Sequence, residues 1–167
     1  MDSQTTEIIG RNYLVSQLAR DGLEVARPER DRGVDLIAYL DLDEAGGGFV
    51  ATPIQMKAAT LRSFGIARKY EKFSRMLFAY VWQVQDPVQS SIYALTYAEA
   101  LGVAEQMGWT VTDSWTIHGR YDTTQPSKKL LDLLDQYLMR PGTWKARVRQ
   151  VGTAPQAPAD ASRSGRP

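Results

Sequence analysis

The chain has 167 residues, with 20 lysines and arginines against 19 aspartates and glutamates, which gives a formal net charge of +1 at pH 7. A chain of this length with 43% hydrophobic residues is typical of one globular domain that needs no disulfide or structural metal to hold its core. The absence of cysteine and the single histidine exclude cysteine-based zinc sites, thiol catalysis and multi-histidine metal centres. Any metal ligands are therefore mostly oxygen atoms.

Hydropathy and charge along the chain predict a cytoplasmic protein. No apolar run approaches the length of a membrane span, and residues 1–7 lack the basic and then apolar pattern of a signal peptide. Charge is unevenly spread: residues 57–75 carry six basic side chains against one acidic side chain, and residues 140–166 are also basic. We expect any polyanion to bind at the first of these patches.

The N-terminal segment predicts a helix over residues 4–20 that ends at Gly22. Glu7 precedes Leu14 and Leu18 by seven and eleven residues, which puts its carboxylate at the N-terminal end of the core-facing stripe. Two interpretations of this acid are open: it complements the helix dipole, or it is a ligand that points into a site.

Three strands are expected next, at residues 23–27, 34–42 and 49–58, of which the last two form a hairpin. Its turn, at residues 43–48, is acidic and rich in glycine. A hairpin that is symmetric about Ala45 places Asp35 directly opposite Gln55, and a bulge would shift this register by one residue.

The middle of the chain predicts a helix over residues 68–73 and two further strands. Residues 76–84 are apolar on both faces, which is typical of a central buried strand, and residues 91–95 form the next strand. Thr96 and Glu99 then form a capping box that opens a helix ending at Gly108.

The C-terminal part predicts a strand over residues 109–117 and an amphipathic helix from Pro126 to Pro141. Residues 151–167 are rich in alanine, proline, serine and glycine and predict a disordered tail. The fold class is therefore α/β: one domain over residues 1–150, with a central mixed sheet flanked by helices.

One group of residues carries candidate chemistry: Glu7 on the first helix, Asp35 on one strand of the hairpin, and Gln55 and Lys57 on the other. An aspartate and an amide oxygen that face each other across a hairpin can share a Mg²⁺ or Mn²⁺ ion, which prefers oxygen ligands and keeps several waters. An ammonium two residues further along the same face can orient a metal-bound water and offset charge on a phosphate.

This group resembles the QxK variant of the motif of the PD-(D/E)xK nuclease superfamily, the restriction endonuclease-like proteins, and in particular short bacterial members. Over residues 4–84, Asp35 in GVDLIA matches the metal-binding aspartate of the second strand, and Gln55 and Lys57 in PIQMK match the (D/E)xK of the third. Glu7 matches the helix-borne acid found in many members. The resemblance implies the core order helix, three antiparallel strands, helix, strand (αβββαβ).

The resemblance also implies a function, namely metal-dependent hydrolysis of DNA phosphodiester bonds by a metal-activated water. Glu7, Asp35 and the Gln55 carbonyl would hold Mg²⁺ or Mn²⁺, and Lys57 would act on the attacking water. Because Gln55 is neutral, the site has one carboxylate fewer than a (D/E)xK site and depends more on Glu7. Cutting both strands generally needs two sites, so a homodimer is expected.

Four basic residues that follow the motif are candidate DNA contacts, and a solvated surface is the alternative interpretation of the same residues. They are Arg62, Arg68, Lys69 and Lys72.

Other functions remain open from the sequence. Taken singly, Asp35 is readable as a strand-end aspartate, Gln55 as a cross-strand hydrogen-bonding residue and Lys57 as a strand-edge charge. The main alternative function is a catalytically degenerate nuclease fold that binds DNA or another protein. A third is an immunity-type or accessory protein.

Overall fold

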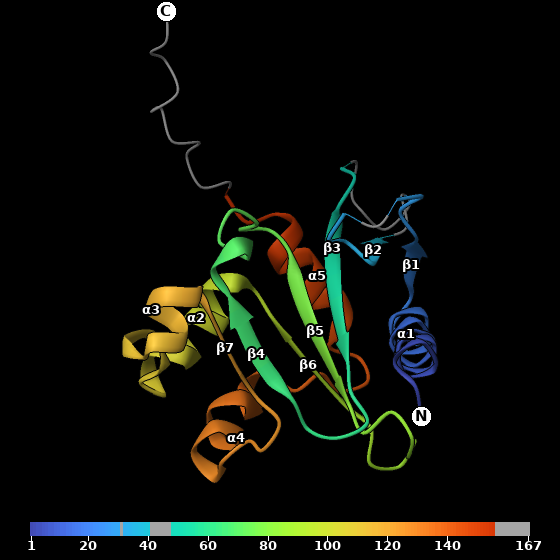
Figure 1. Cartoon of the computed structure of the whole chain (residues 1–167). Coiled ribbons are helices and arrows are strands. Elements are labelled where there is room, and N and C mark those ends of the chain that lie inside the picture. Colours follow the sequence, from blue (N-terminus) through green and yellow to red (C-terminus); the bar gives the residue numbers. More distant parts are fainter. Residues whose placement is uncertain (31, 41–47, 156–167) are drawn as a thin grey trace, which may run out of the picture.

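The computed structural model (Figure 1) describes residues 1–30, 32–40 and 48–155. Its elements, in chain order, are α1 (Ser3–Arg20), β1 (Leu23–Ala26), β2 (Leu36–Leu40), β3 (Ala51–Ala58), β4 (Phe64–Ala67), the 3-10 helix η1 (Arg68–Tyr70), β5 (Leu77–Trp82), β6 (Ser91–Leu95), α2 (Tyr97–Gln106), the 3-10 helix η2 (Trp109–Val111), α3 (Asp113–His118), β7 (Arg120–Thr123), α4 (Lys128–Leu134), the 3-10 helix η3 (Asp135–Tyr137) and α5 (Trp144–Gly152). None of the helices in these ranges is long and apolar enough to cross a membrane.

A five-stranded mixed sheet forms the centre of the molecule, in the order β1-β2-β3-β5-β6. Strands β3 and β5 run parallel, whereas the other neighbouring pairs are antiparallel. Helices lie on both sides of this sheet (Figure 1). The α/β class and the mixed central sheet flanked by helices are therefore confirmed.

The β2–β3 hairpin has the expected register. Leu36 pairs with Ile54 and Tyr39 pairs with Ala51, as symmetry about Ala45 requires. Beyond the last pair, the Asp35 amide donates to the Ile54 carbonyl at 2.9 Å, so the register continues toward Gln55. Most of the expected turn lies outside the described residues.

The connection from β3 to β5 differs from the expected helix over residues 68–73. It contains the strand β4 followed by the three-residue η1, so the order αβββαβ is not reproduced at this point. Strand β4 forms because Phe64 and Ile66 alternate inward with period two. It pairs antiparallel with β7, and the two strands form a separate β4–β7 ribbon.

Two hydrophobic clusters cover the two faces of the sheet, and β5 belongs to both because all six of its residues are buried. On one face, α1 and α5 pack over the sheet. A Cβ on Gly10 of α1 would lie 2.5 Å from the Ala58 Cβ, so the glycine lets α1 approach β3 closely. On the other face lie α2, α4 and the β4–β7 ribbon (Figure 1).

The chain after Gly108 departs most from expectation. The strand expected over residues 109–117 is η2 followed by α3, because the Thr112 hydroxyl accepts a hydrogen bond from the Trp115 amide and caps a helix. The helix expected from Pro126 to Pro141 begins after its N-cap, Ser127, and its regular α-helical part ends at Leu134.

Helix α5 was not expected, and it extends the domain. Trp144, Val148 and Val151 are buried at helical spacing against the sheet. Because α5 continues to Gly152, the expected start of the tail at residue 151 falls within the last turn of this helix. Residues 156–167 of the expected tail lie outside the described residues.

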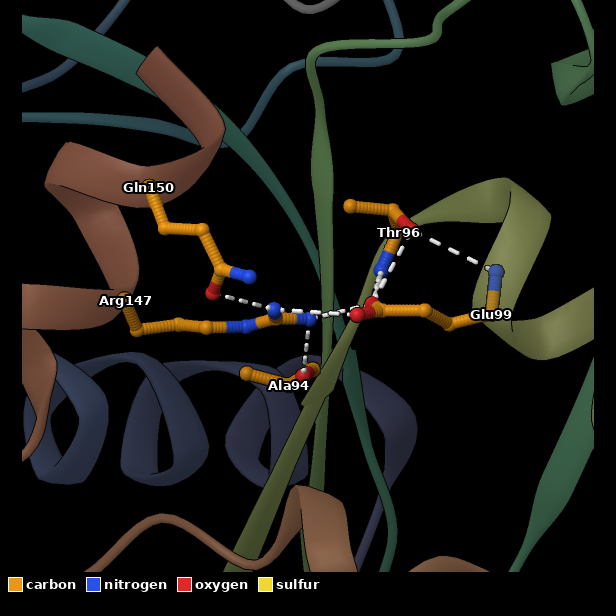
Figure 2. Close-up of polar contacts among 5 residues, drawn as sticks. All are labelled: Ala94, Thr96, Glu99, Arg147 and Gln150. Carbon is orange, nitrogen blue, oxygen red and sulfur yellow. Dashed lines mark hydrogen bonds and ion pairs between the residues drawn. The ribbon is translucent and has the colours of Figure 1, made fainter. Parts of the chain in front are cut away.

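A half-buried ion pair joins α5 to α2 across the end of β6 (Figure 2). The Arg147 guanidinium donates to both carboxylate oxygens of Glu99, and also to the Ala94 carbonyl at 3.1 Å and the Gln150 side chain at 3.0 Å. Glu99 closes the expected capping box with Thr96. Burial alone would raise the pKa of Glu99, but the hydrogen bonds from Arg147 and Thr96 outweigh it and lower that pKa.

Candidate active site

Asp35 and Gln55 are brought together at the open end of the hairpin. The Gln55 side-chain nitrogen donates to Asp35 Oδ2 at 2.7 Å, and the Met56 backbone nitrogen donates to the same oxygen at 2.6 Å. These bonds fix the Asp35 carboxylate against β3 just before β2 begins. A charged acceptor with two such donors is held firmly, because charge-assisted hydrogen bonds are stronger than neutral ones.

Gly33 lies next to the side-chain oxygen of Gln55 and has a backbone conformation that favours glycine. Its φ of +89° lies in the left-handed region, which side chains other than glycine rarely adopt. A Cβ at this position would lie 3.6 Å from Gln55 Oε1. The Gln55 amide therefore presents its nitrogen to Asp35 and its oxygen toward Gly33.

Lys57 shares a face of β3 with Gln55. Ile54 and Met56 point into the cluster beneath α1 and α5, so Gln55 and Lys57 lie on the opposite face by strand alternation. The Lys57 ammonium lies 5.5 Å from the centroid of the Tyr70 ring. The structure thus places three of the four expected site residues on one side of the sheet, along the hairpin.

Glu7 lies elsewhere, and its expected position on the core-facing stripe is wrong. The buried stripe of α1 is Thr6, Gly10, Leu14 and Leu18. The Glu7 side chain is 59% exposed and pairs with Arg11 at 2.9 Å, on a helix that packs against the other face of the sheet. It is also outside the first turn of α1, where a helix-dipole role would place it.

A cavity of about 530 Å³ opens beside Lys57. Its walls come from the end of β3, from β4 and η1, and from the turn that leads into β7. Four of its lining residues are cationic, namely Lys57, Arg68, Lys69 and Arg120, against a single acid, Asp122. None of these four cations forms an ion pair with any residue that the structure describes.

The β4–β7 ribbon positions the cavity wall. Gly65 faces Asp122 across the ribbon, and a Cβ on Gly65 would lie 2.8 Å from the Asp122 Cβ, so the glycine permits the close pairing. The Arg68 amide donates to the Gly119 carbonyl at 2.7 Å, and the Arg68 guanidinium donates to the Trp115 carbonyl at 3.1 Å. Arg68 is therefore anchored to α3, at the far side of the cavity from β3.

The four basic residues expected to contact DNA separate into two groups. Arg68 and Lys69 line the cavity with Lys57. Lys72 lies over the Phe73 ring at 5.1 Å, and Arg62 lines other hollows, beside Gln83. The basic patch read from the sequence is thus divided by the fold.

Sequence reasoning missed Arg120 and His118 as lining residues. Both lie more than fifty residues after Lys57 in the chain, and they reach the cavity only because β7 pairs with β4. No local pattern marks this long-range pairing, since β4 and β7 have four residues each.

The oxygen ligands available for a divalent cation are few. Within residues 1–30, 32–40 and 48–155, no three histidine, cysteine, aspartate or glutamate side chains group together to hold a metal. Asp35 contributes one carboxylate and Gln55 one amide oxygen. Comparisons with protein-family models, curated proteins and solved structures gave no match to this chain.

Proposed function

We propose that the chain is a metal-dependent endonuclease that hydrolyses DNA phosphodiester bonds at Asp35, Gln55 and Lys57. The observation that carries this proposal is the hairpin register, which sets Asp35 against Gln55 and leaves Lys57 on the same face beside a cationic cavity. The order of one helix, three antiparallel strands and a further strand parallel to the third supports the resemblance to the PD-(D/E)xK superfamily. The departure is the connection from β3 to β5, which contains β4 and the short η1 in place of a helix.

The donor set at Asp35 and Gln55 fits Mg²⁺ or Mn²⁺ in composition. Mg²⁺ is commonly held by one or two carboxylates together with waters and substrate phosphate oxygens. Gln55 now directs its nitrogen at Asp35, so sharing a cation requires the amide to turn over and exchange its nitrogen and oxygen. A bound divalent cation would supply a water of lowered pKa and a counter-charge for the phosphate.

In the proposed reaction, the Lys57 ammonium is the positive charge next to the scissile phosphate. In this proposal its ammonium donates hydrogen bonds to a phosphate oxygen and to the attacking water. Donors that are aimed in advance at developing negative charge are worth roughly 100-fold to 1,000-fold in rate when one is removed. The neighbouring cations of the cavity hold the strand on which this phosphate lies.

A second candidate function is supported by the same hydrogen bonds. Gln55 and the Met56 amide both donate to Asp35 Oδ2, which is how a purely structural aspartate would be satisfied at the end of a hairpin. In that case the chain binds nucleic acid or a protein partner without cutting it. Cleavage separates the two functions.

The test is nicking of supercoiled plasmid in Mg²⁺ and in Mn²⁺. We expect wild-type protein to nick, and we expect Asp35→Asn and Lys57→Met to lose at least about 100-fold in rate. The control is Lys128→Met, which removes an 86% exposed lysine on α4 and should nick as wild type does.

A further variant, Gln55→Glu, restores the second carboxylate and should tighten Mn²⁺ binding. Plasmid that remains intact with wild-type protein in both metals would favour the non-catalytic function, and equal nicking by all variants would indicate a contaminating nuclease.

A further inference from the structure

The cavity beside Lys57 concentrates positive charge that the fold does not neutralise. Lys57, Arg68, Lys69 and Arg120 line it, and within the described part of the chain none of them forms an ion pair. Like charges that converge on one hollow repel each other and raise its potential. An anion inside the cavity would relieve this repulsion.

Two of the four ammonium and guanidinium groups approach a single ring. Lys57 Nζ lies 5.5 Å and Lys69 Nζ lies 4.9 Å from the centroid of Tyr70. The Tyr70 ring is itself packed edge-on against Phe78, with centroids 5.0 Å apart. Both lysine ammonium groups therefore lie within about 6 Å of one ring that is held in place by Phe78.

The size of the cavity selects the shape of the anion. Its volume of about 530 Å³ is within the usual range for small-molecule pockets. A sphere of that volume is about 10 Å across, whereas the two backbones of B-DNA are separated by a major groove that is itself roughly 12 Å wide. A duplex therefore does not enter, whereas one nucleotide of a single strand does.

Aromatic side chains make the remaining walls rigid. Tyr121 lies against Trp109 with centroids 4.3 Å apart and an interplanar angle of 18°. Tyr80, whose hydroxyl donates to the Gly65 carbonyl at 2.6 Å, is fully buried behind the cavity, and this burial raises its pKa and keeps it neutral. These rings fix the shape of the cavity, and a positively charged groove follows a single-stranded backbone without reading its sequence.

We propose that this cavity binds one nucleotide of an unpaired nucleic-acid strand, with Lys69 and Arg120 holding its phosphate. The proposal rests on the proposed function for the identity of the anion as nucleic acid, and it narrows the substrate to a strand that is single-stranded at the point of entry. The bound group is a nucleoside phosphate. We assign it to a strand rather than to a free nucleotide because Lys57 lines the cavity and also shares the face of the hairpin that carries Asp35 and Gln55, so a strand can extend from one to the other.

The experiment measures fluorescence anisotropy of a labelled single-stranded oligothymidylate in EDTA, so that no cleavage occurs. The double variant Lys69→Ala/Arg120→Ala should bind at least about 10-fold more weakly than wild type. It should also lower the magnitude of the slope of log K against log salt by about 0.7, since the variant loses one phosphate contact and each such contact on a single strand contributes about 0.7.

The matched control removes two exposed cations from the opposite face, as Arg20→Ala/Arg149→Ala. We expect it to change the affinity less than about twofold. A duplex of the same length should bind wild-type protein more weakly than the single strand does. The proposal is overturned if the cavity variant binds as the control does, or if the duplex binds more tightly with the same dependence on Lys69 and Arg120.

A competition arm distinguishes the strand from a free nucleotide. Thymidine 5′-phosphate should displace the oligonucleotide only at concentrations far above that of the oligonucleotide, because it makes one phosphate contact. Displacement at equal concentration would overturn the assignment to a strand.

Asp35→Asn separates this inference from the proposed function, because it should bind in EDTA as wild type does and fail to nick plasmid. Binding that depends on Lys69 and Arg120 without any cleavage by wild type would contradict the nuclease and leave the cavity assignment standing. Cleavage by wild-type protein, together with binding that does not depend on Lys69 and Arg120, would support the nuclease and overturn the cavity assignment.

Discussion

The molecule places its cations in two different settings. Arg147, whose side chain is 12% exposed, is surrounded by acceptors: two carboxylate oxygens of Glu99, the Ala94 carbonyl and the Gln150 side chain (Figure 2). The cations around the cavity, in contrast, have no carboxylate partner among the described residues, and Arg68, Lys69 and Arg120 are exposed. The first arrangement is a structural ion pair, and we propose that the second binds an anion.

We propose that this contrast separates charge that supports the fold from charge that serves binding. A buried cation with all its donors satisfied needs nothing from outside the chain. Like charges that share one hollow without a carboxylate partner repel each other, and a bound anion would relieve this repulsion. The four predictions below test the contrast from its largest expected effect to its smallest.

Replacement of Arg147 should have the largest effect on stability. Arg147→Met leaves Glu99 half-buried without its guanidinium partner, and we expect the free energy of unfolding to fall by about 2–4 kcal/mol. Urea denaturation measures this loss. The control is Arg149→Met on the exposed side of the same helix, and an equal effect of the two substitutions would contradict a structural role for Arg147.

Ligand-induced stabilisation should depend on the cavity. Single-stranded oligonucleotide at 100 times its dissociation constant should raise the free energy of unfolding of wild-type protein by about 2.7 kcal/mol, since it binds the folded state only. Thermal unfolding in EDTA measures the rise. At the same oligonucleotide concentration, a roughly 10-fold loss of affinity in Lys69→Ala/Arg120→Ala halves the rise to about 1.4 kcal/mol, and a full shift in that variant would place the binding site elsewhere.

Acid should weaken the Arg147–Glu99 pair. The pKa of Glu99 is lowered below its usual 4.5 in the folded protein, so its contribution is complete above that value and is lost as pH falls through the lowered pKa. The stability difference between wild type and Arg147→Met should therefore shrink below about pH 4.5. A difference that stays constant between about pH 6 and pH 3 would show that the pair does not titrate in this way.

Removal of one cavity cation should have the smallest effect and the opposite sign. Lys69→Ala relieves repulsion from Lys57 and Arg68, so the unliganded variant should be as stable as wild type or more stable by a few tenths of a kcal/mol. Urea denaturation at low salt measures this difference best, because salt screens it. A loss above about 1 kcal/mol would mean that Lys69 supports the fold.

Sequence patterns predicted the parts of the fold in which neighbours along the chain are also neighbours in space. The hairpin register followed from strand alternation and a symmetric turn, and it placed Asp35 against Gln55 correctly. The apolar run of β5 and the capping box of Thr96 and Glu99 were also predicted, because each depends on a few adjacent residues.

Features that depend on distant segments were missed. The β4–β7 ribbon joins short strands far apart in the chain, and it decides which cations line the cavity. Helix α5 begins after Pro141 and Gly142 in a segment whose composition is dominated by basic and small residues. The burial of Trp144 and the ion pair of Arg147 with Glu99 depend on the packing of this helix against the folded sheet.

The predicted core-facing position of Glu7 was wrong for a geometric reason. Each residue turns an α-helix by about 100°, so a stripe that steps by four residues rotates about 40° per step around the helix. The buried stripe through Thr6, Gly10, Leu14 and Leu18 follows this rotation across the twisted sheet. At the N-terminal end the covered side has therefore moved about 100° away from Glu7, which leaves its side chain in solvent.

The most direct measurement compares Lys57→Met with Arg147→Met in Mg²⁺-dependent nicking of supercoiled plasmid, at a temperature at which both variants are fully folded. We expect Lys57→Met to lose at least about 100-fold in rate, and Arg147→Met to nick at the wild-type rate in spite of its lower free energy of unfolding. Wild-type nicking by Lys57→Met would contradict the proposal that Lys57 acts on the scissile phosphate.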